Sequence, residues 1–177
     1  MLTAGNFLLR PYLSADATEM STAVRESTET VGRWMSWAKP DFSDYDALCW
    51  FAHCNQARAE GSAHEFGIFD SKGIFIGGCG LNQFSQVNKM CNLGYWVRQS
   101  RQRSGAATSA GLALRDLGLK NLQLARIEIV VAVGNIPSFG VAQKAGAQLE
   151  GVARSRLQIH GQAVSANIFS FTKETDV

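Results

Sequence analysis

Leu93 to Thr108 reads LGYWVRQSRQRSGAAT, and this stretch decides which fold the chain is predicted to have. Its first five residues, 93–97, are mostly aromatic or branched, which is typical of a β-strand. The basic turn that follows has small side chains at 104–107 and then opens a helix. The first turn of a helix has backbone N–H groups without intrahelical partners and carries the positive end of the helix dipole. The stretch therefore predicts a strand, an anion-binding turn and a helix, and a diphosphate is the anion that we expect there.

Three arginines flank this turn and support the anion-binding interpretation. Arg98, Arg101 and Arg103 can each donate charge-assisted hydrogen bonds to phosphate oxygens. The alternative is an ordinary strand-to-helix turn with a solvated basic face. The turn has neither the Gly-Lys-Ser/Thr ending of a P-loop nor the three glycines of a dinucleotide-binding fingerprint. Neither a nucleoside triphosphatase nor a Rossmann dehydrogenase is therefore favoured.

The composition is that of a globular protein. Of the 177 residues, 46% are hydrophobic and 18% are charged, and there is no low-complexity tract. We expect one domain spanning residues 1–177, because a chain of this length buries roughly 70% of its unfolded surface. The net charge of +2 is too small to indicate a nucleic-acid partner.

The cysteines and the apolar runs indicate a cytoplasmic location. Neither a CxxC pair nor a zinc-binding spacing occurs among Cys49, Cys54, Cys79 and Cys91. We expect these thiols to be reduced and buried, and we expect no metal site. No signal peptide precedes them, and the longest apolar runs, 74–81 and 127–133, are far shorter than a membrane span. No membrane partner is therefore expected.

Hydrophobic periodicity predicts a mixed α+β order of elements. The expected strands are 7–10, 65–69, 74–81, 90–97, 126–133, 152–159 and 163–172. The expected helices are 14–27, 28–39, 43–59, 106–119 and 137–146. Capping-box spacing marks two helix starts, at Asp16 with Glu19 and at Ser43 with Asp46. The strands between 65 and 97 predict an antiparallel meander, and the last two predict a hairpin.

Together these features resemble the GNAT superfamily of acetyl-CoA-dependent N-acetyltransferases, and specifically its RimJ/RimL-like branch. Residues 102–107, QRSGAA, fit the superfamily's Q/R-x-x-G-x-G/A pyrophosphate loop, and residues 94–96 are similar to the branch's GYW strand. Further similar motifs are Leu9-Arg10-Pro11, Trp34-x-x-Trp37, Arg126-Ile127-Glu128, Asn135-x-x-Ser138, Lys144-x-Gly146 and Glu150-Gly151. The resemblance covers nearly the whole chain.

The resemblance implies a mostly antiparallel, twisted sheet of about six or seven strands, flanked by about four or five helices. It also implies that the sheet splays between the strand ending at Val97 and the strand 126–133, and that the pantetheine arm of acetyl-CoA enters there. The implied cofactor-binding residues are Tyr95, Trp96, Val97, Gln102, Arg103, Ser104, Gly105, Ala106, Ala107, Thr108, Asn135, Ser138 and Lys144. Trp34 and Trp37 are the implied substrate-binding residues. The alternative for both tryptophans is packing in the core, which is usual for aromatic residues at helical spacing.

Glu128 is the candidate base that removes a proton from the attacking amine. Amines are largely protonated at neutral pH, with pKa values of about 8 for an α-amine and about 10.4 for lysine. Alternation along 126–133 places Glu128 on the strand face opposite the isoleucines. The alternative is that Glu128 pairs with Arg126 or Arg154, or faces water. Weaker candidates for the base are Glu29, His64 and Glu65.

Ser138 is the candidate acid for the departing thiol, because its hydroxyl can form a hydrogen bond with the coenzyme sulfur. The alternative is a helix-start residue that satisfies backbone N–H groups. Two positions depart from the family pattern. Asn92 stands where the branch often has a glutamate, and Ala142 stands where many members have a tyrosine that serves as the acid.

The expected function is direct transfer of an acetyl group from acetyl-CoA to a primary amine in a ternary complex. The resemblance implies a protein or peptide N-terminal α-amine, such as that of a ribosomal protein, as the acceptor. Small-molecule amines, such as antibiotics or polyamines, stay open. An alternative from another class is a catalytically silent acyl-CoA-binding module. Family likeness also implies a homodimer.

Overall fold

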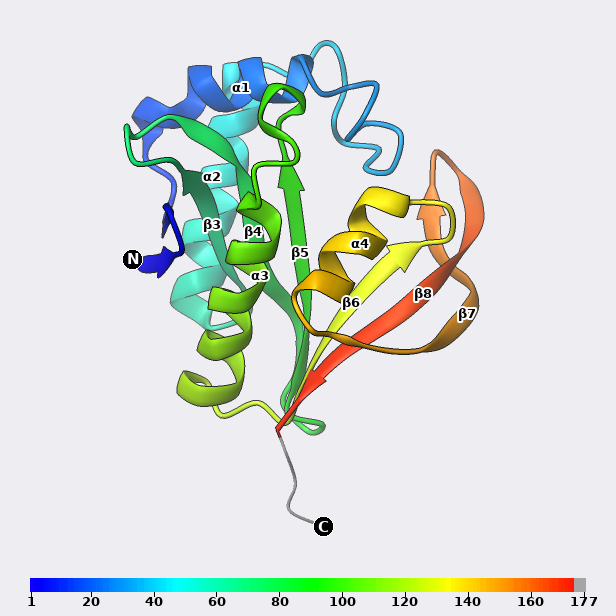
Figure 1. Ribbon diagram of the computed structural model, residues 1–177. Coiled ribbons are helices and arrows are strands. Elements are labelled where there is room, and N and C mark those ends of the chain that lie inside the picture. The colour runs from blue at the N-terminus through cyan, green and yellow to red at the C-terminus, as the bar shows by residue number, and fades with distance from the viewer. Residues whose placement is uncertain (174–177) are drawn as a thin grey trace.

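The computed structural model describes residues 1–173, which form one open, eight-stranded sheet with helices on both faces (Figure 1). The strands lie in the order β1-β2-β3-β4-β5-β6-β8-β7. Their bounds are β1 Leu2–Ala4, β2 Phe7–Arg10, β3 His64–Phe69, β4 Phe75–Ser85, β5 Met90–Val97, β6 Arg126–Ala132, β7 Gln148–Ile159 and β8 Gln162–Thr172. The α-helices are α1 Ala17–Arg25, α2 Asp44–Glu60, α3 Ala106–Asp116 and α4 Ile136–Lys144.

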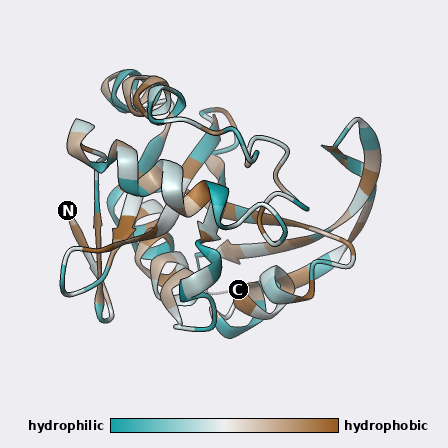
Figure 2. Cartoon of the chain, turned by 90° about the horizontal axis from the view of Figure 1, so that it is seen from above, coloured by the Kyte–Doolittle hydropathy of each residue, from teal (hydrophilic) through white to brown (hydrophobic). Residues whose placement is uncertain are grey.

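Two hydrophobic clusters hold these layers together. The larger one joins the sheet to α3 and α4 and includes Leu114, Ile127 and Phe169. The smaller one joins the sheet to α1 and α2 and is centred on aromatic residues such as Tyr12 and Phe75. In the view from above, hydrophobic positions are visible on the strands that run between the helices (Figure 2). Burial of these apolar side chains is the main force that fixes the helices to the sheet.

Every strand pair is antiparallel except β5 with β6. These two strands are parallel and pair only over Met90–Asn92 and Arg126–Glu128, with Asn92 opposite Glu128. Beyond that point β5 continues to pair with β4 as far as Val97, while β6 continues with β8. The sheet therefore splays between β5 and β6, as the family resemblance implied, and the opening is visible in Figure 1.

The sheet has eight strands, so the expected number of about six or seven was too low. The missed strand is β1, whose three residues, Leu2–Ala4, are too few to give a periodic signal. It joins β2 through a turn at Gly5, which has a φ of +60°. Glycine adopts this left-handed conformation without the steric cost that a side chain would add.

The predicted helix 28–39 is wrong. The structure has a succession of turns in this segment, which connects α1 to α2. The chain folds back on itself at Gly32, and a Cβ atom there would overlap the carbonyl oxygens of Thr28 and Ala38. Close backbone contacts within this segment therefore exclude a helix despite the helical spacing of its apolar residues. We call residues 26–43 the α1–α2 loop.

Two other helix boundaries differ from the predictions. The predicted helix 14–27 is a 3-10 turn at Ser14–Asp16 followed by α1, and the Asp16 carboxylate accepts from the Leu13 N–H at 2.7 Å. Asp16 is thus the N3 residue of this turn and not the N-cap that the capping-box spacing predicted, and no reciprocal capping box forms because the Leu13 side chain has no acceptor. The helix predicted over 106–119 ends at Asp116 and continues as a single π-helical turn, Leu117–Asn121.

Several local predictions are confirmed. Ser43 and Asp46 form the predicted capping box at the start of α2, with the Asp46 N–H donating to the Ser43 hydroxyl at 3.2 Å. The meander is β3, β4 and β5, and the terminal hairpin is β7 and β8. These elements depend on patterns among residues close in the chain, and such patterns can be recognised from the sequence alone.

Candidate active site

The opening between β5 and β6 leaves one edge of β5 without a partner strand. Residues 93–97 pair with β4 on one side, whereas pairing with β6 ends at Asn92. The N–H and C=O groups of such an edge can pair with any extended chain that carries amides. The first turn of α4 lies across the opening, because the Tyr95 hydroxyl on β5 donates to the carbonyl oxygen of Ser138 at 3.0 Å. The site therefore suits an extended, amide-bearing ligand.

The turn after β5 is open to a phosphate group. Residues 101–105 are exposed, and α3 begins at Ala106 without a side-chain cap. Gly105 adopts a φ of +85°, and a Cβ atom there would meet nothing within 4 Å. The small side chains of Ala106 and Ala107 are buried and leave the start of the helix unobstructed. These features fit a diphosphate at the N-terminus of α3.

Arg98 does not face this turn as an anion-binding residue. Its guanidinium is paired with Glu26 at 2.6 Å and 2.9 Å. This pairing lowers the pKa of Glu26 to about 2. Arg101 and Arg103 are exposed, and no protein hydrogen bond to either side chain occurs within residues 1–173, so these two cations can meet a phosphate.

Hydrogen bonds connect residues 98–105, which we call the β5–α3 turn, to the α1–α2 loop. The Gln99 N–H donates to the buried Ser27 hydroxyl at 2.9 Å, and the Gln102 amide donates to Thr30 at 3.1 Å. The Ser100 hydroxyl donates to Glu26 at 2.7 Å. Any movement of the α1–α2 loop is therefore transmitted to the turn.

Trp34 and Trp37 lie in the α1–α2 loop and approach the two diverging strands. Trp37 makes an edge-to-face contact with Trp96 of β5, with ring centroids 5.5 Å apart. Trp34 approaches Gly134, just beyond the end of β6, where a Cβ atom would lie 3.7 Å from the indole. Trp37 retains 39% of its surface exposed. The pair thus lies near the ends of the diverging strands β5 and β6, and substrate contact by either tryptophan remains a prediction.

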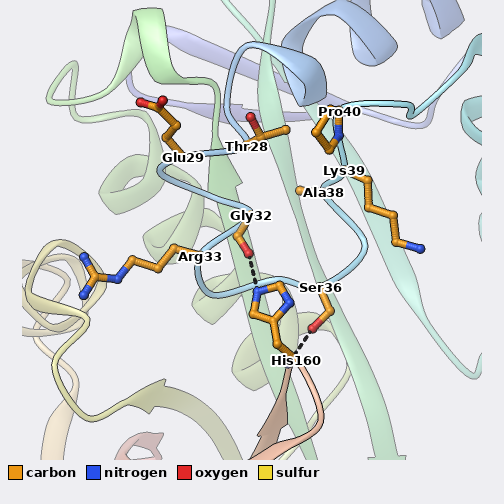
Figure 3. A pocket seen from close by; sticks show the side chains of 9 residues that line it. All are labelled: Thr28, Glu29, Gly32, Arg33, Ser36, Ala38, Lys39, Pro40 and His160. Carbon is orange, nitrogen blue, oxygen red and sulfur yellow. Dashed lines mark hydrogen bonds between the residues drawn. The ribbon is translucent and has the colours of Figure 1, made fainter.

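A shallow pocket lies where the α1–α2 loop meets the tip of the β7–β8 hairpin (Figure 3). His160 at the hairpin tip makes a 2.8 Å hydrogen bond between its Nε2 atom and the Gly32 carbonyl oxygen. The backbone N–H of His160 donates to the Ser36 hydroxyl at 3.1 Å. The lining residues are Thr28, Glu29, Gly32, Arg33, Ser36, Ala38, Lys39, Pro40 and His160. The hairpin thus holds the far end of the α1–α2 loop.

Glu128 stands at the vertex of the splayed strands and is engaged by Arg126. The guanidinium donates to the Glu128 carboxylate at 2.9 Å and 3.1 Å and to Glu150 at 2.6 Å. These contacts lower the pKa of Glu150 to about 2. The geometry matches the alternative in which Glu128 pairs with Arg126, and a role for Glu128 as the base remains a prediction.

A chain of polar side chains, half-buried at the two asparagines and buried at Glu65, crosses the same part of the sheet. The sequence analysis did not predict this connection. The Asn92 side chain donates to Asn82 at 3.0 Å, and Asn82 donates to the Glu65 carboxylate at 2.9 Å. Glu65 is 8% exposed, and this burial raises its pKa. Asn82 lies one residue beyond the predicted strand 74–81, so no sequence pattern pointed to this chain. Asn92, noted only as a missing glutamate, is thereby linked to a carboxylate on β3.

The other predicted residues have the following environments. Asn135 is the N-cap of α4 and accepts from the Ser138 N–H at 3.2 Å. Lys144 is exposed in the last turn of α4, and Thr108 is half-buried in α3. Ala142 is fully buried in the core. His64 packs edge-on against Phe84, away from Glu65.

The chain matches the model of the acetyltransferase (GNAT) domain over residues 6–148. The protein belongs to the GNAT acetyltransferase family. It is 30% identical to the uncharacterized N-acetyltransferase p20 of Bacillus licheniformis, over 77% of this chain and 83% of that protein. It is 26% identical to the putative ribosomal N-acetyltransferase YdaF of Bacillus subtilis, over 89% of this chain and 86% of that protein.

A solved structure places this GNAT protein in the RimJ/RimL-like branch. Mycobacterium smegmatis RimJ, in complex with CoA-disulfide, is 25% identical and superposes with a TM-score of 0.88, covering 98% of this chain and 85% of that one. The protein is therefore an acetyltransferase with the GNAT fold. Within residues 1–173, no helix is long and apolar enough to cross a membrane. That same part of the chain has no group of three His, Cys, Asp or Glu side chains that could hold a metal ion.

Proposed function

We propose that this GNAT protein transfers the acetyl group of acetyl-CoA to the N-terminal α-amine of a protein or peptide. The observation that carries the proposal is the free edge of β5 at 93–97 leading into an uncapped helix start at Ala106. The edge suits the amides of a pantetheine arm, and the helix start suits its diphosphate. The coenzyme supplies an acetyl group activated as a thioester.

The described residues supply binding and orientation for this reaction. The free N–H groups of the β5 edge can donate to a carbonyl oxygen that gains negative charge, which is a large source of rate enhancement in acyl transfer. The acceptor must arrive as a neutral amine. An α-amine, with a pKa of about 8, meets this requirement at neutral pH far more often than a lysine side chain, with a pKa of about 10.4.

The charges of the pocket in Figure 3 favour a peptide end over a polyamine. Its lining contains one carboxylate, Glu29, beside the cations Arg33 and Lys39. In Figure 3 the Glu29 carboxylate points away from His160, and it is the one carboxylate among the lining residues. A polycation needs several unpaired carboxylates, and the nearby Glu26 is already paired with Arg98. The names of the relatives YdaF and RimJ are in line with a ribosomal-protein acceptor.

The test compares acceptors that differ only in the amine. We would incubate the protein with acetyl-CoA and a peptide with a free N-terminus, the same peptide with a blocked N-terminus and an internal lysine, spermidine, or an aminoglycoside. Thiol release and the mass of the product are measured. We expect release with the free N-terminus alone. Thiol release with spermidine or the aminoglycoside would mean that the acceptor is a small-molecule amine and not a peptide. Coenzyme binding without thiol release from any acceptor would favour a catalytically silent acyl-CoA-binding module.

The coenzyme site is tested separately with Gly105→Val. Valine resists a φ of +85° by about 1–3 kcal/mol and would distort the start of α3. We expect weaker coenzyme A binding by calorimetry. The matched control is Gly61→Val, because Gly61 has a φ of +69°, equally open surroundings and a remote position at the end of α2. Equal coenzyme affinity in both variants would contradict the assignment of the turn.

A further inference from the structure

The proposed function requires a donor beside the sulfur of the departing thiol, and α4 does not provide one from its core-facing side. Ala142 has no exposed surface and packs in the cluster that joins α4 to the sheet. A side chain there carries no hydroxyl and has no path to the opening. A donor supplied by α4 would therefore be a residue other than Ala142, and Ser138 near the start of the helix has a hydroxyl.

Tyr95 reaches the start of α4 from the opposite side of the opening. It belongs to the part of β5 that no longer pairs with β6. Its phenolic oxygen lies 3.0 Å from the Ser138 carbonyl oxygen and 3.0 Å from the Ser138 hydroxyl. Figure 1 shows α4 in front of the region where β5 and β6 separate. The phenol and the serine hydroxyl thus meet at the opening.

Ser138 is free to serve a ligand because another residue caps the helix. The side chain of Asn135 accepts from the Ser138 N–H, so the Ser138 hydroxyl has no capping task. Within residues 1–173, the partner of that hydroxyl is Tyr95. Burial raises the pKa of Tyr95 to about 12, so the phenol keeps its proton at neutral pH.

We propose that Tyr95 positions Ser138 to donate a hydrogen bond to the sulfur of the departing coenzyme A thiolate. The inference rests on the proposed function. The phenol has one proton and two acceptors at equal distance, the carbonyl and hydroxyl oxygens of Ser138. When the phenol donates to the hydroxyl oxygen, the serine's own proton is free to point at a third atom. When the phenol donates to the carbonyl oxygen instead, the serine proton can turn toward Tyr95, so the acceptor that Tyr95 uses sets the orientation of the Ser138 hydroxyl.

The proton balance of the reaction does not require ionisation of Tyr95. The amine nitrogen forms a bond to the acetyl carbon, and the carbon–sulfur bond breaks with its electron pair going to sulfur. The amine loses one proton, to a protein base or to solvent, and the thiolate gains one from solvent, so no net charge is created. A phenol with a pKa of about 12 is a weaker acid than a thiol, for which about 8.5 is usual, so Ser138 and Tyr95 keep their protons. Their contribution is a charge-assisted hydrogen bond.

The test measures the pKa of the coenzyme A thiol when it is bound, as well as turnover. Thiolate absorbance is titrated in the binary complex, and the complex with desulfo-coenzyme A, which lacks the thiol, provides the blank. Tyr95→Phe and Ser138→Ala remove one hydroxyl each. A hydrogen bond to a charged group changes a pKa by about one unit, so each variant should raise the pKa of the bound thiol by that amount. Turnover should fall about tenfold or more.

Three controls define the role. Ser138→Thr keeps the hydroxyl and should retain most of the effect. Tyr45→Phe removes a phenol that is 74% exposed on α2 and should change nothing. The double variant should be no worse than either single one, because coupled residues are not additive. The other titratable groups on β5 and α4 are the buried Cys91 and the exposed Lys144. Both are present in every variant, so they do not account for a difference in thiol pKa between variants.

The outcomes separate this inference from the proposed function. If the parent protein binds coenzyme A and turns over, but Tyr95→Phe leaves both the thiol pKa and turnover unchanged, the positioning role is wrong. If Tyr95→Phe weakens only coenzyme affinity, the contact is a structural bridge across the opening, which also overturns the inference. Failure of the parent protein to bind coenzyme A would instead overturn the proposed function itself.

Discussion

Glu128 shares Arg126 with Glu150, and this sharing determines how its role can be tested. Removing the charge of Glu128 leaves Arg126 paired with Glu150, so the local fold should survive. The position at the vertex of β5 and β6 places Glu128 opposite Asn92, whose amide is linked through Asn82 to Glu65. Glu128 and Glu65, on different strands, are thus both candidates for the base, which stays a prediction.

The first prediction concerns Glu128→Gln. If Glu128 is the base, turnover should fall by about 10²–10⁴-fold, because positioned proton transfer contributes about that much. The dependence of kcat on pH should shift as well. Glu150→Gln is the matched control, since it removes the other partner of Arg126. An unchanged pH profile in Glu128→Gln would show that Glu128 is not the base, and Glu65 would then be the next candidate.

At the scale of elements, an ion pair between Glu26 and Arg98 connects the end of α1 to the β5–α3 turn. The folded-state pKa of Glu26 is about 2, below its ordinary value of 4.5. The ion pair therefore stabilises the fold at pH values above 4.5, and this stabilisation is lost as the pH falls through about 2. The same carboxylate also accepts from Ser100, so its loss should loosen the turn.

The second prediction concerns Glu26→Gln. At pH 7 the variant should lose roughly 1 kcal/mol of unfolding free energy in urea, because solvent screens a partly exposed pair. The difference from the parent should shrink as the pH falls from 4.5 towards 2. Coenzyme A affinity should fall although Glu26 is not expected to touch the phosphates. Glu29→Gln, at an exposed neighbour, is the control; a constant difference across the pH range would contradict the ion-pair account.

At the scale of the whole molecule, the α1–α2 loop is hydrogen-bonded at one part to the β5–α3 turn and at another to the terminal hairpin. Ser27 and Thr30 bind the turn, while Gly32 and Ser36 bind His160. The loop is the part of the structure most directly placed to shape the acceptor side. The hairpin contacts should therefore affect acceptor binding more than coenzyme binding.

The third prediction concerns His160→Ala. Loss of the hydrogen bond to Gly32 should raise the KM for a peptide acceptor about 2- to 10-fold, which is the range expected for one hydrogen bond. Coenzyme A affinity should stay constant, and hydrogen exchange should rise in residues 28–40. His53→Ala on α2, remote from the hairpin, is the control. An equal rise in exchange throughout the protein would indicate general destabilisation and contradict the local role.

The family resemblance implied the splay of the sheet. The sequence by itself determined the family and the succession of strand, turn and helix from β5 to α3. These features depend on contiguous patterns, such as QRSGAA before a helix, whose geometry is set by residues close in the chain. Only the tertiary structure decided which side chains meet. Glu26 and Arg98 are separated by 72 residues, and Tyr95 and Ser138 by 43, so no local pattern records either contact. Such pairs depend on strand register and helix placement, which burial of the whole core determines. In the segment 28–39, burial of Val31 and Ala38 in the cluster with α1 and α2 accompanies the turns that replace the predicted helix.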